Sequence, residues 1–230
     1  DRGDIVTPAP EALAVVDERA RYLPEILETS SRLASLVGEA VAEGSSPLVL
    51  GGDHSVALGT LAGLAGAAGQ PGGVLWIDAH GDLNTPETSP SGNVHGMPLA
   101  AALGCCGAWF AHDGLPLPAV DPARVVLVGI RSLDQAERAF LRESDVRVFT
   151  MSDIDRIGIE RAVREALARV AGPGFGVSGA AVGSVRTAGS AARHPTAAAA
   201  RPPTPPSTSV EPLSTNTSVV SFFLSVWVVV

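Results

Sequence analysis

Acidic and imidazole side chains follow a short apolar run near the middle of the chain. Residues 78–82 read Asp-Ala-His-Gly-Asp and come directly after the apolar residues 74–77. Such a run predicts a buried strand, and side chains two apart on a strand point the same way, so we expect Asp78, His80 and Asp82 to converge at its end. Neighbouring carboxylates repel unless a proton or a cation lies between them. Oxygen and imidazole donors without a thiolate favour a hard or borderline divalent metal ion, and the alternative is a strand end with solvated acids.

A second segment has the same form. Residues 48–55 read Leu-Val-Leu-Gly-Gly-Asp-His-Ser, and a helical pattern follows over residues 56–68. The glycine pair allows the backbone to turn sharply after the strand. Because ligands gather beyond the carboxyl ends of the strands of a parallel sheet, we expect His54 to meet the acids of residues 78–82 there. A lone histidine after a strand is more often a structural residue, but two such strand ends together favour a metal centre.

The strands and helices that would position these side chains alternate along the chain. Apolar runs predict strands over residues 48–50, 74–77, 125–130 and 146–151, and helical patterns cover residues 21–43, 56–68, 134–143 and a run ending near residue 172. This alternation requires right-handed parallel crossovers and predicts a three-layer α/β/α fold with a mostly parallel sheet. Ser152 and Asp155 have the spacing of a capping box at the start of the last helical pattern.

Composition bounds the class of protein. The chain has 230 residues, of which 46% are hydrophobic and 17% charged, as expected for one domain with a large core. Its net charge is -8 and it has no basic run that could neutralise phosphates, so we expect no nucleic-acid partner.

The cysteines indicate in which cellular compartment the protein is expected. Cys105 and Cys106 are adjacent and cannot form an ordinary unstrained disulfide with each other, so we expect two reduced thiols and a cytoplasmic protein. No apolar signal precedes the first helix.

The apolar residues 219–230 are fewer than the roughly 20 needed to span a bilayer, so we expect no membrane partner. The chain starts with Asp1 rather than Met, which suggests a fragment or a processed product.

The last quarter of the sequence differs from the rest. Of the 24 acidic residues only Glu211 lies beyond residue 175, and alanine, proline, serine and threonine dominate there. Such a composition buries too little apolar area to offset its ordering entropy. We therefore predict an α/β domain over residues 1–175 and a low-complexity tail over residues 176–230 that is disordered or translated out of frame.

Several ordered motifs along the chain resemble one protein family. Residues 51–55 and 78–84 are similar to the first two metal motifs of the ureohydrolases, which hydrolyse guanidinium groups at a dimanganese centre. The Ser, Gly and Asn pattern of residues 88–98 narrows the resemblance to bacterial-type arginases, and residues 128–134 and 149–158 agree with it. The resemblance covers about residues 1–175. It implies hydrolysis of L-arginine to L-ornithine and urea by a homo-oligomer, usually a trimer or hexamer.

The resemblance also implies roles for individual side chains. Two Mn2+ ions would occupy an intact site, with Asp78 bridging them, His54 and Asp82 on one ion and His80 on the other. His95 would pass a proton to the departing ornithine nitrogen. The substrate residues implied are Asn84, Ser89, Ser91 and Asn93 around the α-carboxylate and Asp134 near the α-amino group. From the residues alone, the polar side chains of this loop could instead form turns. Two readings of Glu137 stay open: it assists Asp134 in recognising the substrate, or it is a solvated helix-face acid.

The sequence departs from the family pattern at both ends. The family's opening strand and helix have no counterpart before residues 1–5, so we expect a fold truncated at both ends. The family's later Ser-x-Asp-x-Asp strand is replaced by Ser-Gly-Ala-Ala-Val at residues 178–182, and no aspartate follows Asp155. We therefore expect weakened metal binding and little turnover. Two alternatives stay open: an inactive arginine-binding subunit, and a sister ureohydrolase such as an agmatinase.

Overall fold

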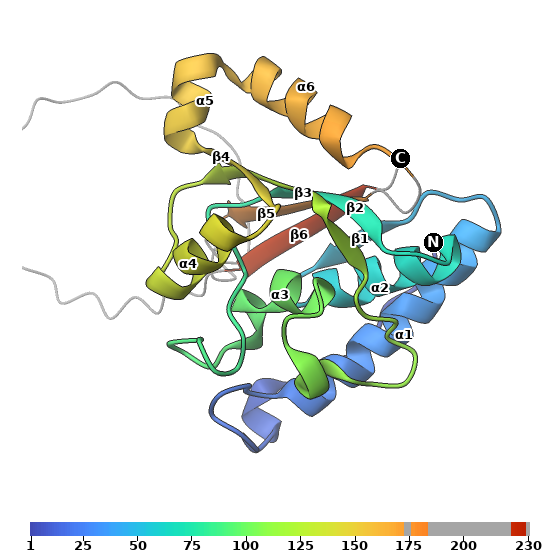
Figure 1. Cartoon of the computed structure of the whole chain (residues 1–230). Coiled ribbons are helices and arrows are strands. Elements are labelled where there is room, and N and C mark those ends of the chain that lie inside the picture. Colours follow the sequence, from blue (N-terminus) through green and yellow to red (C-terminus); the bar gives the residue numbers. More distant parts are fainter. Residues whose placement is uncertain (173–175, 184–221, 229–230) are drawn as a thin grey trace, which may run out of the picture.

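The computed structural model is built around one six-stranded sheet and describes residues 1–172, 176–183 and 222–228 (Figure 1). The strands are β1 (Leu48–Gly51), β2 (Gly72–Ile77), β3 (Val120–Ile130), β4 (Arg147–Thr150), β5 (Gly176–Gly183) and β6 (Phe222–Val228), in the spatial order β1-β6-β5-β2-β3-β4. Neighbouring strands among β5, β2, β3 and β4 pair in parallel, whereas β6 pairs antiparallel with both β1 and β5. The predicted mostly parallel sheet is confirmed.

Helices cover both faces of this sheet. On one side lie α1 (Leu23–Ala42), α2 (Val56–Ala68) and α3 (Pro98–Ala102), and on the other lie α5 (Met151–Ile157) and α6 (Ile159–Val170) (Figure 1). Short 3-10 helices occur at η1 (Pro10–Ala12), η2 (Val94–Gly96) and η3 (Gly107–Phe110). The three-layer α/β/α fold predicted from the sequence is therefore confirmed.

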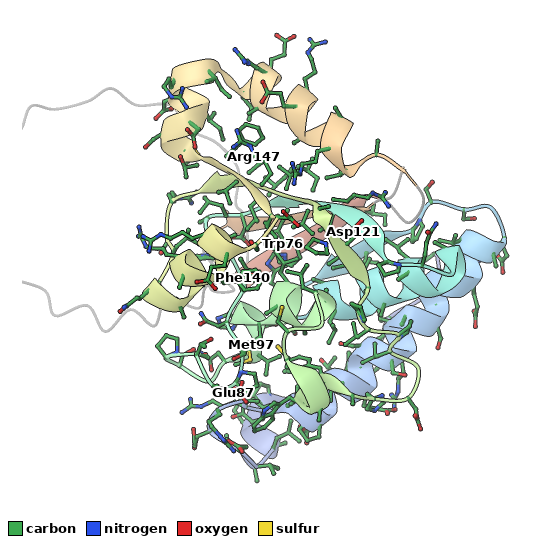
Figure 2. The ribbon with its side chains drawn as sticks, viewed as in Figure 1. Trp76, Glu87, Met97, Asp121, Phe140 and Arg147 are labelled. Atoms are coloured by element: carbon green, nitrogen blue, oxygen red, sulfur yellow. The ribbon has the colours of Figure 1, made fainter. Side chains whose placement is uncertain are left out.

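Alternation along the central strands explains why two helical layers are needed. Val74 and Trp76 of β2 pack with α2, whereas Leu75 between them packs with α6. Because successive strand side chains point to opposite faces, a strand that is apolar at every position must be covered on both. Trp76 lies at the centre of the molecule (Figure 2), on the same side of the sheet as Phe140 of α4 (Gln135–Glu143).

The helix that follows β4, α5, begins differently from the sequence prediction. Ser152 and Asp155 do not form the capping box. Instead Thr150 accepts a hydrogen bond from the Asp153 backbone N–H, and the Asp153 carboxylate accepts one from the Thr150 N–H. The reason is that β4 ends at Thr150 with no intervening turn, which places Ser152 inside the first helical turn.

The predicted tail contributes both β5 and β6, and the rest of residues 176–230 lies outside the described residues. The boundary at residue 175 and the disordered or out-of-frame character of the tail stay predictions. Among the residues that the structure describes, no helix has the length and apolarity needed to cross a membrane.

α1 and α2 pack unusually closely because glycines of α2 face the backbone of α1. A Cβ added at Gly59 would lie 2.5 Å from the Ser30 carbonyl oxygen, and one at Gly63 would lie 2.6 Å from the Ala34 carbonyl oxygen. Neither position has room for a methyl group unless the two helices move apart.

We expect Gly63→Ala to lower the free energy of unfolding by about 1–3 kcal/mol, because overpacking displaces backbone rather than a flexible side chain. Gly66→Ala on the same helix is the matched control, since its Cβ would lie 3.5 Å from the Pro116 side chain. The control should be neutral or stabilising by up to about 1 kcal/mol through helix propensity. Urea denaturation of both variants checks this, and equal effects would contradict it.

Candidate metal centre

Loop geometry at the ends of β1 and β2 assembles the site. β2 ends at Ile77, so Asp78 already lies in the loop, where its N–H donates to the Val128 carbonyl of β3 (3.1 Å). Asp82 has a left-handed backbone (φ 52°), a conformation that aspartate tolerates better than most residues. These two acids therefore meet through the fold of the loop and not through the strand alternation expected from the sequence.

Three predicted side chains form a compact buried group. The Nδ1 atom of His54 lies 3.1 Å from Asp78 Oδ2 and 2.7 Å from Asp82 Oδ2. One ligand atom from each of the three residues lies within 4.8 Å of the others. The three residues are 4%, 8% and 6% exposed, respectively. The structure therefore brings His54 together with the acids of residues 78–82, as expected.

His80 lies on the other side of Asp78. Its Nδ1 atom is 3.2 Å from Asp78 Oδ1, and its backbone N–H donates to the same oxygen (3.0 Å). The His80 side chain is half exposed, unlike the compact group. Asp78 thus presents one carboxylate oxygen to His54 and the other to His80, so the four predicted ligands surround two adjacent positions.

Burial and mutual contact set the protonation of the group. Burial opposes charging of His54, but the two carboxylates outweigh it and raise its pKa to about 9. Burial raises the pKa of Asp82 above its ordinary value. Burial also works against ionisation of Asp78, yet the His54 contact and the His80 N–H lower its pKa. The Trp76 ring, 4.3 Å from the His54 ring, closes the inner side of the group.

These donors suit one divalent cation. Ligand atoms around a six-coordinate ion with bonds of about 2.1 Å lie about 3 Å apart, which matches the two His54 contacts. A cation in place of the imidazolium proton would also remove the repulsion between Asp78 and Asp82. Among the described side chains, His80 and the outer oxygen of Asp78 are available to a second cation. Two ligand atoms are few for a divalent ion.

We expect Mn2+ binding to release a proton, because His54 must be neutral to act as a ligand and its pKa is about 9. The apparent affinity should therefore rise with pH, by up to about tenfold per unit between roughly pH 6.5 and 8. Calorimetric titration in two buffers of different ionisation enthalpy counts the protons. A binding enthalpy that does not depend on the buffer would contradict the expectation.

His95 faces an acid that sequence reasoning did not assign to the site. Its Nδ1 atom lies 3.6 Å from Asp53 Oδ2, and this contact raises the pKa of His95. Asp53 directly precedes His54, so the end of β1 supplies both a metal-group histidine and a partner for His95. The sequence could have pointed to Asp53 as part of the site, because this acid directly precedes His54.

Four of the predicted substrate residues, Asn84, Ser89, Ser91 and Asn93, lie on the loop between β2 and α3, and Asp134 is the N-cap of α4. Figure 2 shows this loop reaching from Glu87 at the outside to Met97 in the core. Asn84 donates its Nδ2 to Asp134 Oδ2 (2.6 Å), so these two predicted residues are in direct contact. Ser89 and Ser91 accept hydrogen bonds from the Gly92 and Asn93 N–H groups (3.0 and 3.2 Å), as in the turn-forming alternative. Their assignment to substrate stays a prediction.

The outer part of this loop is held against the segment before α1. The Arg21 N–H donates to the Gly92 carbonyl (2.9 Å), and Arg21 and Asn93 form an isolated parallel bridge. Gly92 has φ +69°, and a Cβ there would overlap the Glu18 carbonyl oxygen. Only glycine fits at this close approach.

We expect Gly92→Ala to destabilise the protein and displace the loop. Gly44→Ala is the matched control, because Gly44 has a similar backbone (φ +78°) but open space around it. The strain of positive φ is common to both variants, so the difference isolates the clash and should be about 1–3 kcal/mol. Thermal unfolding of the two variants measures it, and equal losses of stability would refute the close packing.

Two further residues lie beside the group: the sequence left the role of Glu137 open and assigned no role to Trp76. Glu137 is only 6% exposed, so the alternative of a solvated acid is wrong. It forms a capping box with Asp134, and the Asp-x-x-Glu spacing was a signal that could have revealed it. Trp76 stands behind His54, and no local pattern distinguishes it from other core residues of β2.

The sheet and the His/Asp group at the carboxyl ends of its strands define an α/β protein with a candidate metal centre. Residues 1–178 match the model of the Arginase family. The chain belongs to the arginase family of hydrolases, which confirms the resemblance found in its motifs.

Relatives with known names support this family assignment. The arginase of Bacillus caldovelox is 48% identical over 169 residues, which are 73% of this chain and 56% of that protein. Its solved structure has a TM-score of 0.64 at 47% identity, covering 69% of this chain and 52% of the other. Bacillus subtilis arginase gives 0.65 at 44% identity, covering 73% and 56%. The chain thus spans about half the length of the relatives it matches.

Proposed function

We propose that this chain carries the arginine-hydrolysing site of a manganese-dependent arginase, which converts L-arginine and water into L-ornithine and urea. The observation that carries the proposal is the buried contact of His54 Nδ1 with both Asp78 and Asp82. The relatives at 48% and 44% identity are named arginases, which supports this reaction over that of a sister ureohydrolase such as an agmatinase.

The cation-binding role falls to four side chains. His54, Asp78 and Asp82 would hold one Mn2+, and His80 with the outer oxygen of Asp78 would contribute to a second position. The chemistry that divalent cations would supply here is activation of water as a nucleophile for a guanidinium carbon near neutral pH. Trp76 and the surrounding core exclude bulk water from the inner side and strengthen the electrostatic contacts of the group.

The proton for the leaving group comes from His95. The carboxylate of Asp53 raises the pKa of His95, which keeps its ring protonated closer to neutral pH and orients Nδ1. The half-exposed ring can then give a proton to the departing ornithine nitrogen and recover one from solvent.

Arginine is recognised through its amino-acid end by the loop between β2 and α3. We assign the α-carboxylate to the polar side chains Asn84, Ser89, Ser91 and Asn93, and the α-amino group to the Asp134 carboxylate. Their support is the Asn84–Asp134 contact, which places an amide and a carboxylate side by side next to the candidate metal centre.

The register of β5 explains why activity should be low in this chain. β5 pairs in parallel with β2, and the last pair of this register is Ile77 with Gly179, so Asp78 and Ala180 each follow the end of the paired segment. Residue 180 stands where the family's Ser-x-Asp-x-Asp pattern has its first aspartate, and alanine has no ligating atom. The family match ends at residue 178, just before this position.

We therefore expect the unmodified chain to bind about one Mn2+ and to release little urea from arginine. Ala180→Asp combined with Val182→Asp should raise the bound manganese toward two ions and increase urea release, because residues two apart on a strand face the same way. The matched control is Ala181→Asp, which places one carboxylate on the opposite face. Metal analysis and a urea assay decide, and no gain over this control would count against the proposed register and function.

A second candidate function is arginine binding without hydrolysis. Two observations favour it. Asn84 and Asp134, which we assign to the amino-acid end of arginine, are in contact, whereas residue 180 is an alanine and cannot bind a cation. Calorimetry separates the two functions, since this candidate predicts binding of L-arginine, weaker binding of agmatine, which lacks the α-carboxylate, and no urea.

The setting that we propose is a cytoplasmic homo-oligomer, a trimer or hexamer as the family resemblance implies. Support for a reducing compartment comes from Cys105 and Cys106, which are both free thiols.

A further inference from the structure

Glu137 is a buried acid that contacts the loop bearing the candidate metal ligands. It lies in the first turn of α4, and its Oε1 accepts a hydrogen bond from the Leu83 N–H (3.3 Å). Its Oε2 accepts one from the Asp134 N–H (3.0 Å). A Cβ added at Gly81 would lie 2.9 Å from Glu137 Oε1, so the loop and the carboxylate are in close contact.

The Leu83 N–H belongs to the same peptide unit as the Asp82 carbonyl. That carbonyl accepts hydrogen bonds from the Leu99 and Ala100 N–H groups of α3 (both 3.1 Å). The peptide is therefore held at its oxygen by α3 and at its nitrogen by Glu137. Because Asp82 has a positive φ of 52°, this peptide needs fixing on both sides to keep the left-handed conformation that turns the Asp82 carboxylate toward His54.

The same carboxylate also orients a predicted substrate residue. Through the capping box, Glu137 accepts from the backbone of Asp134 while Asp134 Oδ1 accepts from the Glu137 N–H (2.9 Å). The second oxygen of Asp134 is thereby turned to Asn84. One buried side chain thus links the Asp82 backbone to the Asn84–Asp134 pair.

The capping box of α5, also in the described part of the chain, shows that a capping acid does not ordinarily contact a distant loop. Asp153 of α5 accepts from the Thr150 N–H and hydroxyl and from Arg156, all within its own turn. It contacts no loop from elsewhere in the sequence through these bonds, and its side chain is 32% exposed. Asp153 therefore serves as a matched reference for loss of a helix cap alone.

We propose that Glu137 is a positioning residue that fixes the Asp82–Leu83 peptide and aligns Asp134 with Asn84, so that the cation group and the amino-acid loop keep one geometry. The inference rests on the proposed function for the identity of the cation and of the amino acid. The backbone contacts of Glu137 themselves involve neither ligand.

Glu137→Gln is the first test, since its amide nitrogen cannot accept a hydrogen bond and leaves either the Leu83 or the Asp134 N–H without an acceptor. In the metal-free protein, amide exchange at Leu83 should become at least about tenfold faster. The Kd for Mn2+ should rise about 10-fold or more, as is typical when a group that orients a ligand is lost. Asp153→Asn should lower Tm while leaving both quantities unchanged.

The results that overturn the proposal are distinct from those that overturn the function. If Glu137→Gln lowers Tm like Asp153→Asn but leaves Leu83 exchange and Mn2+ binding as in the parent chain, Glu137 is a helix cap only. If the parent chain binds no Mn2+, the proposed function fails, and Leu83 exchange alone decides the positioning role. If Glu137→Gln does not fold, Glu137→Asp replaces it, because the shorter acid keeps the charge but cannot reach both N–H groups.

Discussion

The contact of two buried carboxylates with one imidazole is the constraint on which the rest of the site depends. Asp78 and Asp82 both face His54 Nδ1 at the carboxyl end of the sheet, where little water screens their charges. Such a group is stable only with a positive charge at its centre, supplied by a proton on His54 or by a metal ion. The same physical requirement accounts for the raised pKa of His54 and for the fit of a divalent cation.

The surrounding structure fixes the backbone that carries these charges. β3 receives the Asp78 N–H, α3 binds the Asp82 carbonyl, and Glu137 of α4 binds the next N–H along the chain. The loop of predicted substrate residues continues from this segment, and the Arg21–Gly92 contact holds its outer end. The cation group and the amino-acid loop are therefore parts of one connected unit, built from segments that are distant in the sequence.

Much of this could be predicted from the sequence because local patterns determine it. The apolar runs before Asp53 and Asp78 identified two parallel strands, and the rule that ligands gather beyond their ends brought His54 to the acids. What failed depended on tertiary contacts or on exact element ends. The two readings of Glu137 could not be separated from the helix pattern, because the loop that covers this side chain comes from residues 81–84. The capping box was misplaced because β4 runs directly into α5 at Thr150.

The central claim is that His54, Asp78 and Asp82 together hold one manganese ion. Anomalous X-ray diffraction from crystals soaked in Mn2+, recorded on both sides of the manganese absorption edge, tests it most directly. The account predicts a manganese peak in contact with His54 Nδ1 and one carboxylate oxygen from each acid. Anomalous density that is absent there, or that lies only at exposed acids elsewhere, would contradict it.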